Sequence, residues 1–322
     1  MLKKLKFIKI LGTGLGFILV ALGVSRLTAA SVITACTAFG IGPASAITAS
    51  ASGVAEMESI RFFLVHQIPV IIPLNLILMV SYFFVNRYFD KKENTEKEVE
   101  VKEENGKEKA PDYYAIIPVL PLILLLIFSD IFSFFPTGIR LNTTTAMFIS
   151  FFVALLFEWA RIKSLKKLFQ SMNIFWGGMG NFFKSVVTLI IAADIFSQGL
   201  ISLGFIDGLV EGSRHLGFGP VGIGIVMTIL IYLASMLMGS GNASFFAFGP
   251  LVPDIAARFG VQVTRMILPM SLAASMGRTV SPVAGVLIAV SDVAGVTALS
   301  IVKRNLIPLT SALIFLLIYS SI

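Results

Sequence analysis

The sequence predicts an all-α polytopic membrane protein, and three observations lead to that fold class. Hydrophobic residues make up 56% of the 322 positions, charged residues only 13%, and the mean hydropathy is +0.91. A soluble domain carries about a quarter charged residues, so this chain lacks the polar material to cover a water-facing surface. The apolar residues are also gathered into blocks long enough to cross a bilayer, and parts of these blocks repeat along the chain.

The sequence contains nine hydrophobic blocks, each judged by comparison with the roughly 20 apolar residues that a spanning helix needs. They lie at 7–22, 27–53, 62–86, 113–135, 142–160, 184–204, 219–258, 262–292 and 305–322. Three of them are too long, or too rich in Gly, Pro, Ser and Thr, to be plain helices. We expect broken helices at 27–53 and 262–292 and a re-entrant hairpin at 219–258.

Two stretches fall outside the predicted spans. Residues 89–111 are rich in Glu and Lys and predict a flexible, solvated linker. Residues 161–183 begin with a basic, amphipathic run, which predicts a helix lying on the membrane surface. Membrane proteins keep their Lys/Arg excess on the cytoplasmic side, so both stretches are placed there together with Lys303 and Arg304. The net charge of +7 therefore reflects membrane topology and predicts no nucleic-acid partner.

A faint repeat relates residues that are 239 positions apart. Pro43 corresponds to Pro282, and the pair Ile68-Pro69 corresponds to Ile307-Pro308. The two units run in opposite directions, because block 62–86 leads toward the cytoplasm and block 305–322 leads away from it. Inverted repeats with broken helices are the architecture of many secondary transporters, whose substrate binds near the middle of the membrane. The predicted fold is therefore an inverted-repeat transporter with a re-entrant hairpin and broken helices.

The repeat also divides the chain into three parts. Residues 1–88 form the remainder of the first unit, 89–111 form the charged linker, and 112–322 form the second unit. The second unit has a hairpin before its broken helix, whereas the first has only the short block 7–22. We expect the missing counterpart to lie upstream of Met1 or on another polypeptide, and without it the chain could be a remnant that does not transport.

The strongest local signal is the run from Met238 to Ser244, which interrupts a long apolar block with small and polar residues. Small residues let the backbone leave a helix and approach a ligand. Unpaired N–H groups at a half-helix start, with hydroxyl and amide side chains, make a cradle for an anion. The predicted substrate-binding residues are Ser240, Gly241, Asn242 and Ser244. The alternative is a Gly/Ser motif that only packs helices.

The second signal is Arg278, which lies in the middle of an apolar block beside Thr279, Ser281 and a helix-breaking proline. A cation within the membrane is expensive and is by default a functional hypothesis. Arginine can bind a carboxylate with two parallel hydrogen bonds. An ion pair with Asp194, which also lies in a span, is an open alternative.

The third signal is the repeat partner of that break, from Gly40 to Thr48, with Pro43 and Ser45 as candidate site residues. It has the composition of a broken helix but no arginine, so a plain packing kink is an alternative. For the other polar residues we expect structural roles. We expect His66 to be a core residue whose polar atoms have hydrogen-bond partners, and His215 to be a solvated loop residue. We expect Arg258 to form an ion pair with Asp254.

These motifs resemble the C-type anaerobic dicarboxylate carriers of bacteria (DcuC). The resemblance rests on Gly239-Ser240-Gly241-Asn242-Ala243 and on the run from Gly277 to Val286, and it extends from about Gly12 to the C-terminus. It implies exchange, uptake or efflux of four-carbon dicarboxylates such as succinate and fumarate across the cytoplasmic (inner) membrane. It also implies that Ser240, Asn242, Thr279, Ser281 and Pro43 line the site.

Other functions stay open at this point. Relatives in the same superfamily carry other organic anions. An intramembrane hydrolase with Ser240 as nucleophile would need a nearby base, and neither His66 nor His215 is recognisably paired with it, so no enzyme is expected. We expect no cofactor and no metal, and the coupling ion is either a proton or sodium. The expected partners are the dicarboxylate, the lipid bilayer, and either a second copy of the chain or a chain that supplies the missing spans.

Overall fold

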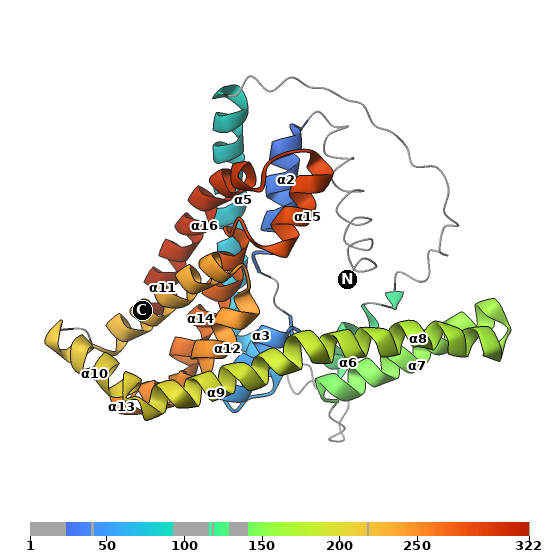
Figure 1. Cartoon of the computed structure of the whole chain (residues 1–322), viewed down its shortest axis with the longest axis horizontal. Coiled ribbons are helices and arrows are strands. Elements are labelled where there is room, and N and C mark those ends of the chain that lie inside the picture. Colours follow the sequence, from blue (N-terminus) through green and yellow to red (C-terminus); the bar gives the residue numbers. More distant parts are fainter. Residues whose placement is uncertain are drawn as a thin grey trace.

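The computed structural model describes residues 24–39, 42–92, 116–117, 119–128, 141–217 and 219–321. Within these ranges every regular element is helical, which confirms the predicted all-α fold (Figure 1). The helices are α2 (Arg26–Ala35), α3 (Ala46–Val54), α4 (Ser59–Arg61), η1 (Phe62–Gln67), α5 (Ile68–Lys92), α6 (Leu120–Ile127), α7 (Thr143–Ile162), α8 (Leu165–Phe182), η3 (Phe183–Val187), α9 (Thr188–Ser202), α10 (Phe205–His215), α11 (Pro220–Met238), α12 (Gly241–Phe248), η4 (Gly249–Leu251), α13 (Val252–Phe259), α14 (Val263–Thr279), α15 (Gly285–Ala294) and α16 (Ala298–Ser321).

Several helices are long and apolar enough to cross a membrane. Four such segments lie within the described ranges: Ser59–Lys92, Thr143–Ile162, Pro220–Met238 and Ala298–Ser321. A fifth candidate is the pair Thr188–Ser202 and Phe205–Ser213, whose two parts are bent by 61°. A multi-pass membrane protein is thereby confirmed.

Some predicted segments are described only in part. Block 7–22 lies outside the described residues, and of block 113–135 the structure describes α6 with its immediate neighbours. Helix α5 continues to Lys92, past the predicted start of the linker at 89, and residues 93–115 lie outside the described ranges. The linker itself therefore stays a prediction.

The helix breaks occur where small residues and prolines interrupt the apolar blocks. Block 27–53 is divided into α2 and α3, and block 262–292 into α14 and α15. In block 219–258, α11 ends at Met238 and is followed by Gly239, which adopts the left-handed conformation with φ +69°. The chain then begins α12, which packs back against α11. The return arm of this hairpin is divided into α12, η4 and α13.

The first half of each broken helix packs against the second half of the other. Helix α2 lies beside α15, and α3 lies beside α14, while α5 packs along α16 (Figure 1). The helix starts also follow the predicted offset of 239 residues, since Ala46 and Gly285 begin α3 and α15, and Ser59 and Ala298 begin α4 and α16. Both features fit two inverted units, whereas the division of the chain into those units stays a prediction.

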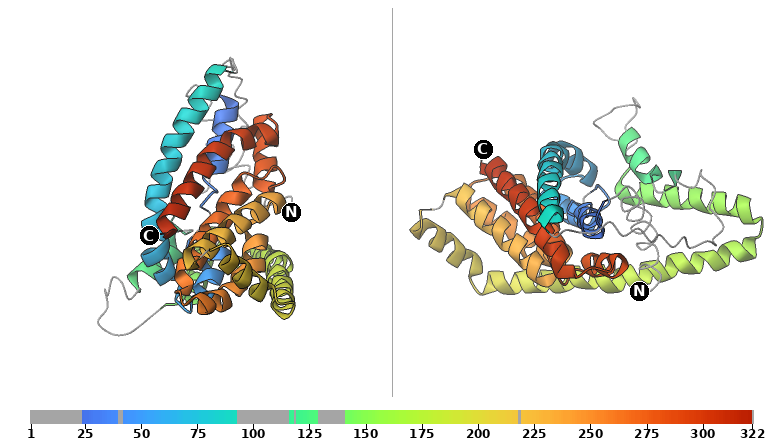
Figure 2. Two further views of the ribbon diagram at one scale, coloured as in Figure 1. Left: turned by 90° about the vertical axis from the view of Figure 1, so that its left-hand side faces the viewer. Right: turned by 90° about the horizontal axis from the view of Figure 1, so that it is seen from above.

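The helices α7, α8 and α9 form an arm beside this packed unit. Helices α8, η3 and α9 follow one another without a break, and α7 packs against α8. The arm runs across the direction of α5, as the two further views make clear (Figure 2). Helix α8 confirms that residues 161–183 are mainly helical, and its place on the membrane surface stays a prediction.

The core lies around α14, which is buried along nearly its whole length from Met266 to Gly277. Helix α14 packs against α11, α12 and α16 and also against α3. Gly277 allows the closest of these approaches, because a Cβ atom there would collide with the carbonyl oxygen of Tyr232 and lie 2.9 Å from Cβ of Ser235. The end of α14 is thereby held next to both the hairpin and the first broken helix.

Candidate functional site

The tip of the hairpin is built around the start of α12. Ser240 is the N-cap residue, and its Oγ accepts a hydrogen bond of 3.2 Å from the backbone N–H of Ala243. Asn242 is half-buried, and within the described residues its side chain has no hydrogen-bond partner. Ser244 is fully buried, and its hydroxyl donates to the carbonyl of Gly241 at 3.1 Å. Ser240 and Asn242 are therefore available at the tip, whereas the hydroxyl of Ser244 is engaged within its own helix.

This tip is pressed onto the break between α14 and α15. A Cβ atom on Gly239 would lie 3.0 Å from the carbonyl carbon of Val283 and 3.1 Å from the nitrogen of Ala284. A Cβ atom on Gly241 would lie 2.7 Å from the carbonyl oxygen of Ala274. Glycine is needed at both positions, because a side chain on Gly239 would separate the hairpin tip from the break and one on Gly241 would separate it from α14. The structure thus brings the first and second predicted signals together.

The break between α14 and α15 contains two buried hydroxyl groups. Thr279 donates to the carbonyl of Ser275 at 3.2 Å, and Ser281 accepts from the backbone N–H of Val283 at 3.3 Å. Helix α15 begins after Ala284, which provides no side-chain cap. The first N–H groups of α15 are thereby left for solvent or a ligand.

The first broken helix contributes the start of α3. Pro43 is buried, and Ser45 is the N-cap residue, whose Oγ accepts from the N–H of Thr48 at 3.1 Å. The hydroxyl of Thr48 donates to the side-chain oxygen of Gln67 at 3.1 Å. Since α3 packs against α12 and α14, the third predicted signal belongs to the same packed unit as the other two.

Arg278 connects the two breaks. Its Nη2 donates a hydrogen bond of 2.9 Å to the backbone carbonyl of Thr37, just beyond the end of α2. Its Nε is buried and has no partner within the described residues. The alternative of an ion pair with Asp194 is wrong, because Asp194 lies exposed on α9 and the guanidinium binds a backbone carbonyl instead.

Sequence reasoning missed Asn305, which is fully buried on α16. Its Nδ2 donates to Oγ1 of Thr34 and to the carbonyl of Thr279, each at 3.0 Å. It therefore joins the last turn of α2 to the end of α14. The signal that could have found it is a polar amide next to an arginine inside a helix long enough to span the membrane.

The predictions for the other polar residues had mixed outcomes. His66 is half-buried with its ring 5.7 Å from that of Phe62, and His215 is exposed. The predicted pairing of Arg258 with Asp254 is wrong, because Arg258 forms its ion pair with Asp207 on α10. That geometry is favoured because α13 packs against α10.

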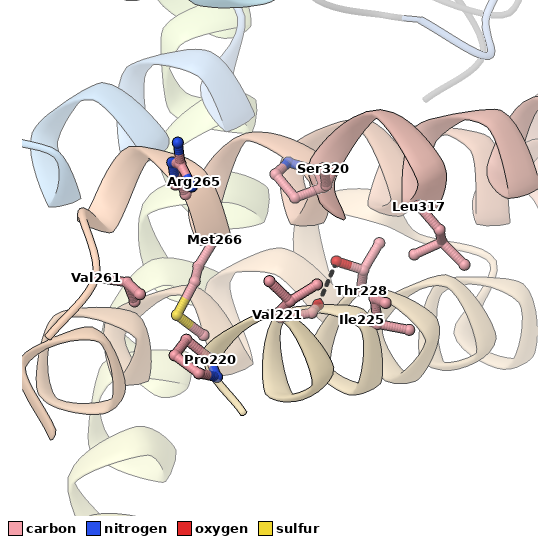
Figure 3. A pocket seen from close by; sticks show the side chains of 11 residues that line it. Pro220, Val221, Ile225, Thr228, Val261, Arg265, Met266, Leu317 and Ser320 are labelled. Carbon is pink, nitrogen blue, oxygen red and sulfur yellow. Dashed lines mark hydrogen bonds between the residues drawn. The ribbon is translucent and has the colours of Figure 1, made fainter. Parts of the chain in front are cut away.

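A pocket lies elsewhere, between the N-terminal parts of α11 and α14 and the C-terminal end of α16 (Figure 3). Its lining is mostly apolar, with Pro220, Met266 and Leu317 beside Thr228 and Arg265. The hydroxyl of Thr228 is bonded to the carbonyl of Gly224 within its own helix at 2.7 Å. None of the predicted site residues lines this pocket, so it is separate from the breaks.

Helical spans, two broken helices and a hairpin tip pressed onto one of the breaks define a multi-pass membrane protein of the carrier type. The chain matches the family described as the C4-dicarboxylate anaerobic carrier over residues 15–322, and it belongs to that family. The resemblance identified from the motifs is thereby confirmed. Because the family consists of transporters, the chain is not an enzyme, and the hydrolase alternative is excluded.

Individual relatives agree with this assignment. The anaerobic C4-dicarboxylate transporter DcuC of Escherichia coli (strain K12) is 33% identical over 315 residues, which cover 95% of this chain and 67% of that protein. The protein of the same name from Shigella flexneri gives the same values. A relative from Vibrio cholerae serotype O1 is 33% identical over 95% of this chain and 68% of its own length.

Proposed function

We propose that the chain carries four-carbon dicarboxylates such as succinate and fumarate across the bacterial cytoplasmic membrane, by exchange, uptake or efflux. The observation that carries this proposal is the contact between the hairpin tip and the break before α15. Two helix starts, those of α12 and α15, adjoin at this contact through Gly239 and Ala284. Helix N-termini attract anions through their free N–H groups and the positive end of the helix dipole.

The side chains around the contact between the hairpin tip and the break suit a carboxylate. Asn242 has an uncommitted amide at the tip, and the hydroxyl of Ser240 can donate while its oxygen caps α12. Arg278 adds a positive charge at the end of α14, three residues before Ser281. A second carboxylate group would require a second set of donors, for which the N–H groups at the start of α3 are the candidate, because the hydroxyl of Ser45 itself donates to Oγ1 of Thr48 at 2.9 Å. The relatives named above are transporters of C4-dicarboxylates, which supports the choice of substrate.

A binding experiment tests the proposal. The purified protein in mild detergent is titrated with succinate and fumarate, with gluconate as a matched organic anion, and thermal unfolding is followed. We expect stabilisation by the two dicarboxylates only. Replacing Asn242 with alanine should lower the affinity for succinate about 10-fold or more, because a hydrogen bond to a charged group contributes about 1.5–3 kcal/mol.

Ser244→Ala is the control, because its hydroxyl is bonded inside α12 and should contribute little to binding. Stabilisation by gluconate in place of the dicarboxylates would assign the chain to a carrier of another organic anion. Equal losses in Asn242→Ala and Ser244→Ala would contradict the placing of the anion at the hairpin tip.

A further inference from the structure

The C-terminal ends of two half-helices come together inside the molecule. Helix α2 ends at Ala35 and is followed by a turn in which Thr37 and Ala38 bond back to Thr34 and Ala35. Helix α14 ends at Thr279. The last carbonyl groups of a helix lack partners within it, and together they behave like about half a negative charge. Two such ends close together are therefore stabilised by hydrogen-bond donors and by positive charge.

Arg278 places its positive charge next to both helix ends. It lies in the last turn of α14, so its own helix end is next to its charge. Its guanidinium also reaches the carbonyl of Thr37 at the end of α2, 2.9 Å from Nη2. One fixed cation thus faces the negative ends of both half-helices, although the two residues that it joins are far apart in the sequence.

Asn305 supplies a further donor to the same two ends. Its Nδ2 binds the carbonyl of Thr279, which is the last residue of α14, and Oγ1 of Thr34 in the last turn of α2. The carbonyl of Thr279 can only accept, so the contact requires the NH₂ side of the amide and fixes its orientation. Asn305 is fully buried on α16, and its Oδ1 has no partner within the described residues.

No carboxylate balances this cation within the part of the chain that the structure describes. The partner of Arg278 there is a backbone carbonyl. The acidic residues of the described spans lie elsewhere. Three of them are bound to other arginines: Asp90 to Arg304, Glu158 to Arg161 and Asp207 to Arg258. Asp194 and Glu211 are exposed on α9 and α10. A buried charge is costly unless it is compensated, so the helix ends themselves provide the compensation.

In inverted-repeat carriers, the C-terminal ends of half-helices and unwound carbonyl groups are where coupling cations bind. We infer that Arg278 is a tethered cation, which occupies the place of a bound monovalent cation between the ends of α2 and α14, with Asn305 as the positioning residue. This inference rests on the proposed carrier function, because it concerns the ion dependence of the same site. The chain then needs no sodium at this position to hold its two broken helices together.

The test compares variants that keep or remove the charge. Arg278→Lys retains it on a shorter side chain, and Arg278→Gln removes it while keeping hydrogen-bond donors. The apparent Tm of each purified protein is measured without dicarboxylate, in sodium chloride and in choline chloride of equal ionic strength. Guanidinium chloride at low millimolar concentration serves as a soluble replacement for the missing side chain.

We expect the wild type and Arg278→Lys to have the same Tm in both salts. Arg278→Gln should unfold at a lower temperature in choline and should recover most of that loss in sodium or guanidinium. A wild-type Tm that rises with sodium would overturn the inference, and so would a glutamine variant that matches the lysine variant in choline. A folded glutamine variant that responds to neither cation would overturn it as well.

Two further readouts keep the result interpretable. If Arg278→Gln does not fold, Arg278→Lys carries the test, because the inference requires its Tm to be the same in sodium chloride and in choline chloride, and a Tm that rises with sodium would overturn it. The proposed function is read separately, from the succinate stabilisation of the wild type in choline chloride. Loss of that stabilisation would count against the dicarboxylate proposal and would leave the cation dependence of the Tm unaffected.

Discussion

Arg304 is the residue whose role differs most from the expectation for its sequence position. Its side chain is 1% exposed, although the Lys/Arg excess predicts only that it lies on the cytoplasmic side. Nη1 forms an ion pair with Asp90 at 2.5 Å and a hydrogen bond to Thr28 at 2.6 Å, and the guanidinium lies 5.7 Å from the ring of Phe89. Asp90 also accepts from Ser25, the N-cap residue of α2. These contacts fasten the start of α2 to the end of α5 and to α16.

Replacing Arg304 with alanine should therefore destabilise the protein. Removing one partner of a buried ion pair costs about 3–5 kcal/mol, and because Asp90 is 31% exposed, we expect about 3 kcal/mol. The measurement is the free energy of unfolding in mild detergent. Lys303→Ala is the control, since Lys303 is the preceding residue and is exposed. Equal losses in the two variants would show that the ion pair adds nothing to stability.

At the scale of elements, the breaks depend on glycines that differ in what surrounds them. Gly239 and Gly260 both end a helix in the left-handed conformation, with φ values of +69° and +64°. A Cβ atom on Gly239 would touch Val283 and Ala284, whereas one on Gly260 would meet nothing within 4 Å. The pair separates the effect of backbone strain from the effect of the contact between tip and break.

Gly260→Ala should therefore lose only the strain of a non-glycine residue in this conformation, about 1–2 kcal/mol of stability. Gly239→Ala should lose more, and it should also weaken succinate binding, because the added methyl group pushes the tip away from the start of α15. Unfolding and succinate titrations of both variants provide the comparison. Unchanged succinate affinity in a folded Gly239→Ala variant would contradict a binding site at this contact.

The positions of the breaks could be predicted from the sequence, whereas the ends of the outer helices could not. Gly, Pro and Ser interrupt the apolar blocks near 239 and 282, and the helices indeed stop there. Helix α16 begins at Ala298 rather than at 305, because Arg304 is neutralised by Asp90 and can lie inside the helix. A charge indicates a helix end only when it has no partner, and the partner of Arg304 lies on another helix.

At the scale of the whole molecule, the packing joins segments that are distant in the sequence. The composition and the offset of 239 residues predicted broken helices, but which halves lie side by side depends on the tertiary fold. The bond from Arg278 to Thr37 leaves no local pattern, since its two residues belong to different broken helices. For the same reason Asn305 could be recognised only as a polar residue in an apolar helix, and its two partners came from the structure.

The arrangement of the helices makes a prediction about membrane sidedness. Lys92 and Lys303 lie at one end of the packed unit, because Asp90 on α5 binds Arg304 on α16. Helix α10, which carries Glu211, lies at the opposite end of the molecule from the C-terminal end of α5 (Figure 1). The Lys/Arg excess predicts that the end with the two lysines faces the cytoplasm.

Single cysteines can test this sidedness once Cys36, which is exposed, is replaced by alanine. In intact cells, a membrane-impermeant maleimide should label Glu211→Cys directly and should label Lys92→Cys and Lys303→Cys only after permeabilisation. Opposite results for the two lysine positions would contradict the packing of α5 along α16, because the ion pair requires them on one side. Direct labelling of both lysine positions, with Glu211→Cys protected, would keep that packing but reverse the orientation, and the Lys/Arg excess would then fail as a guide to the topology of this chain.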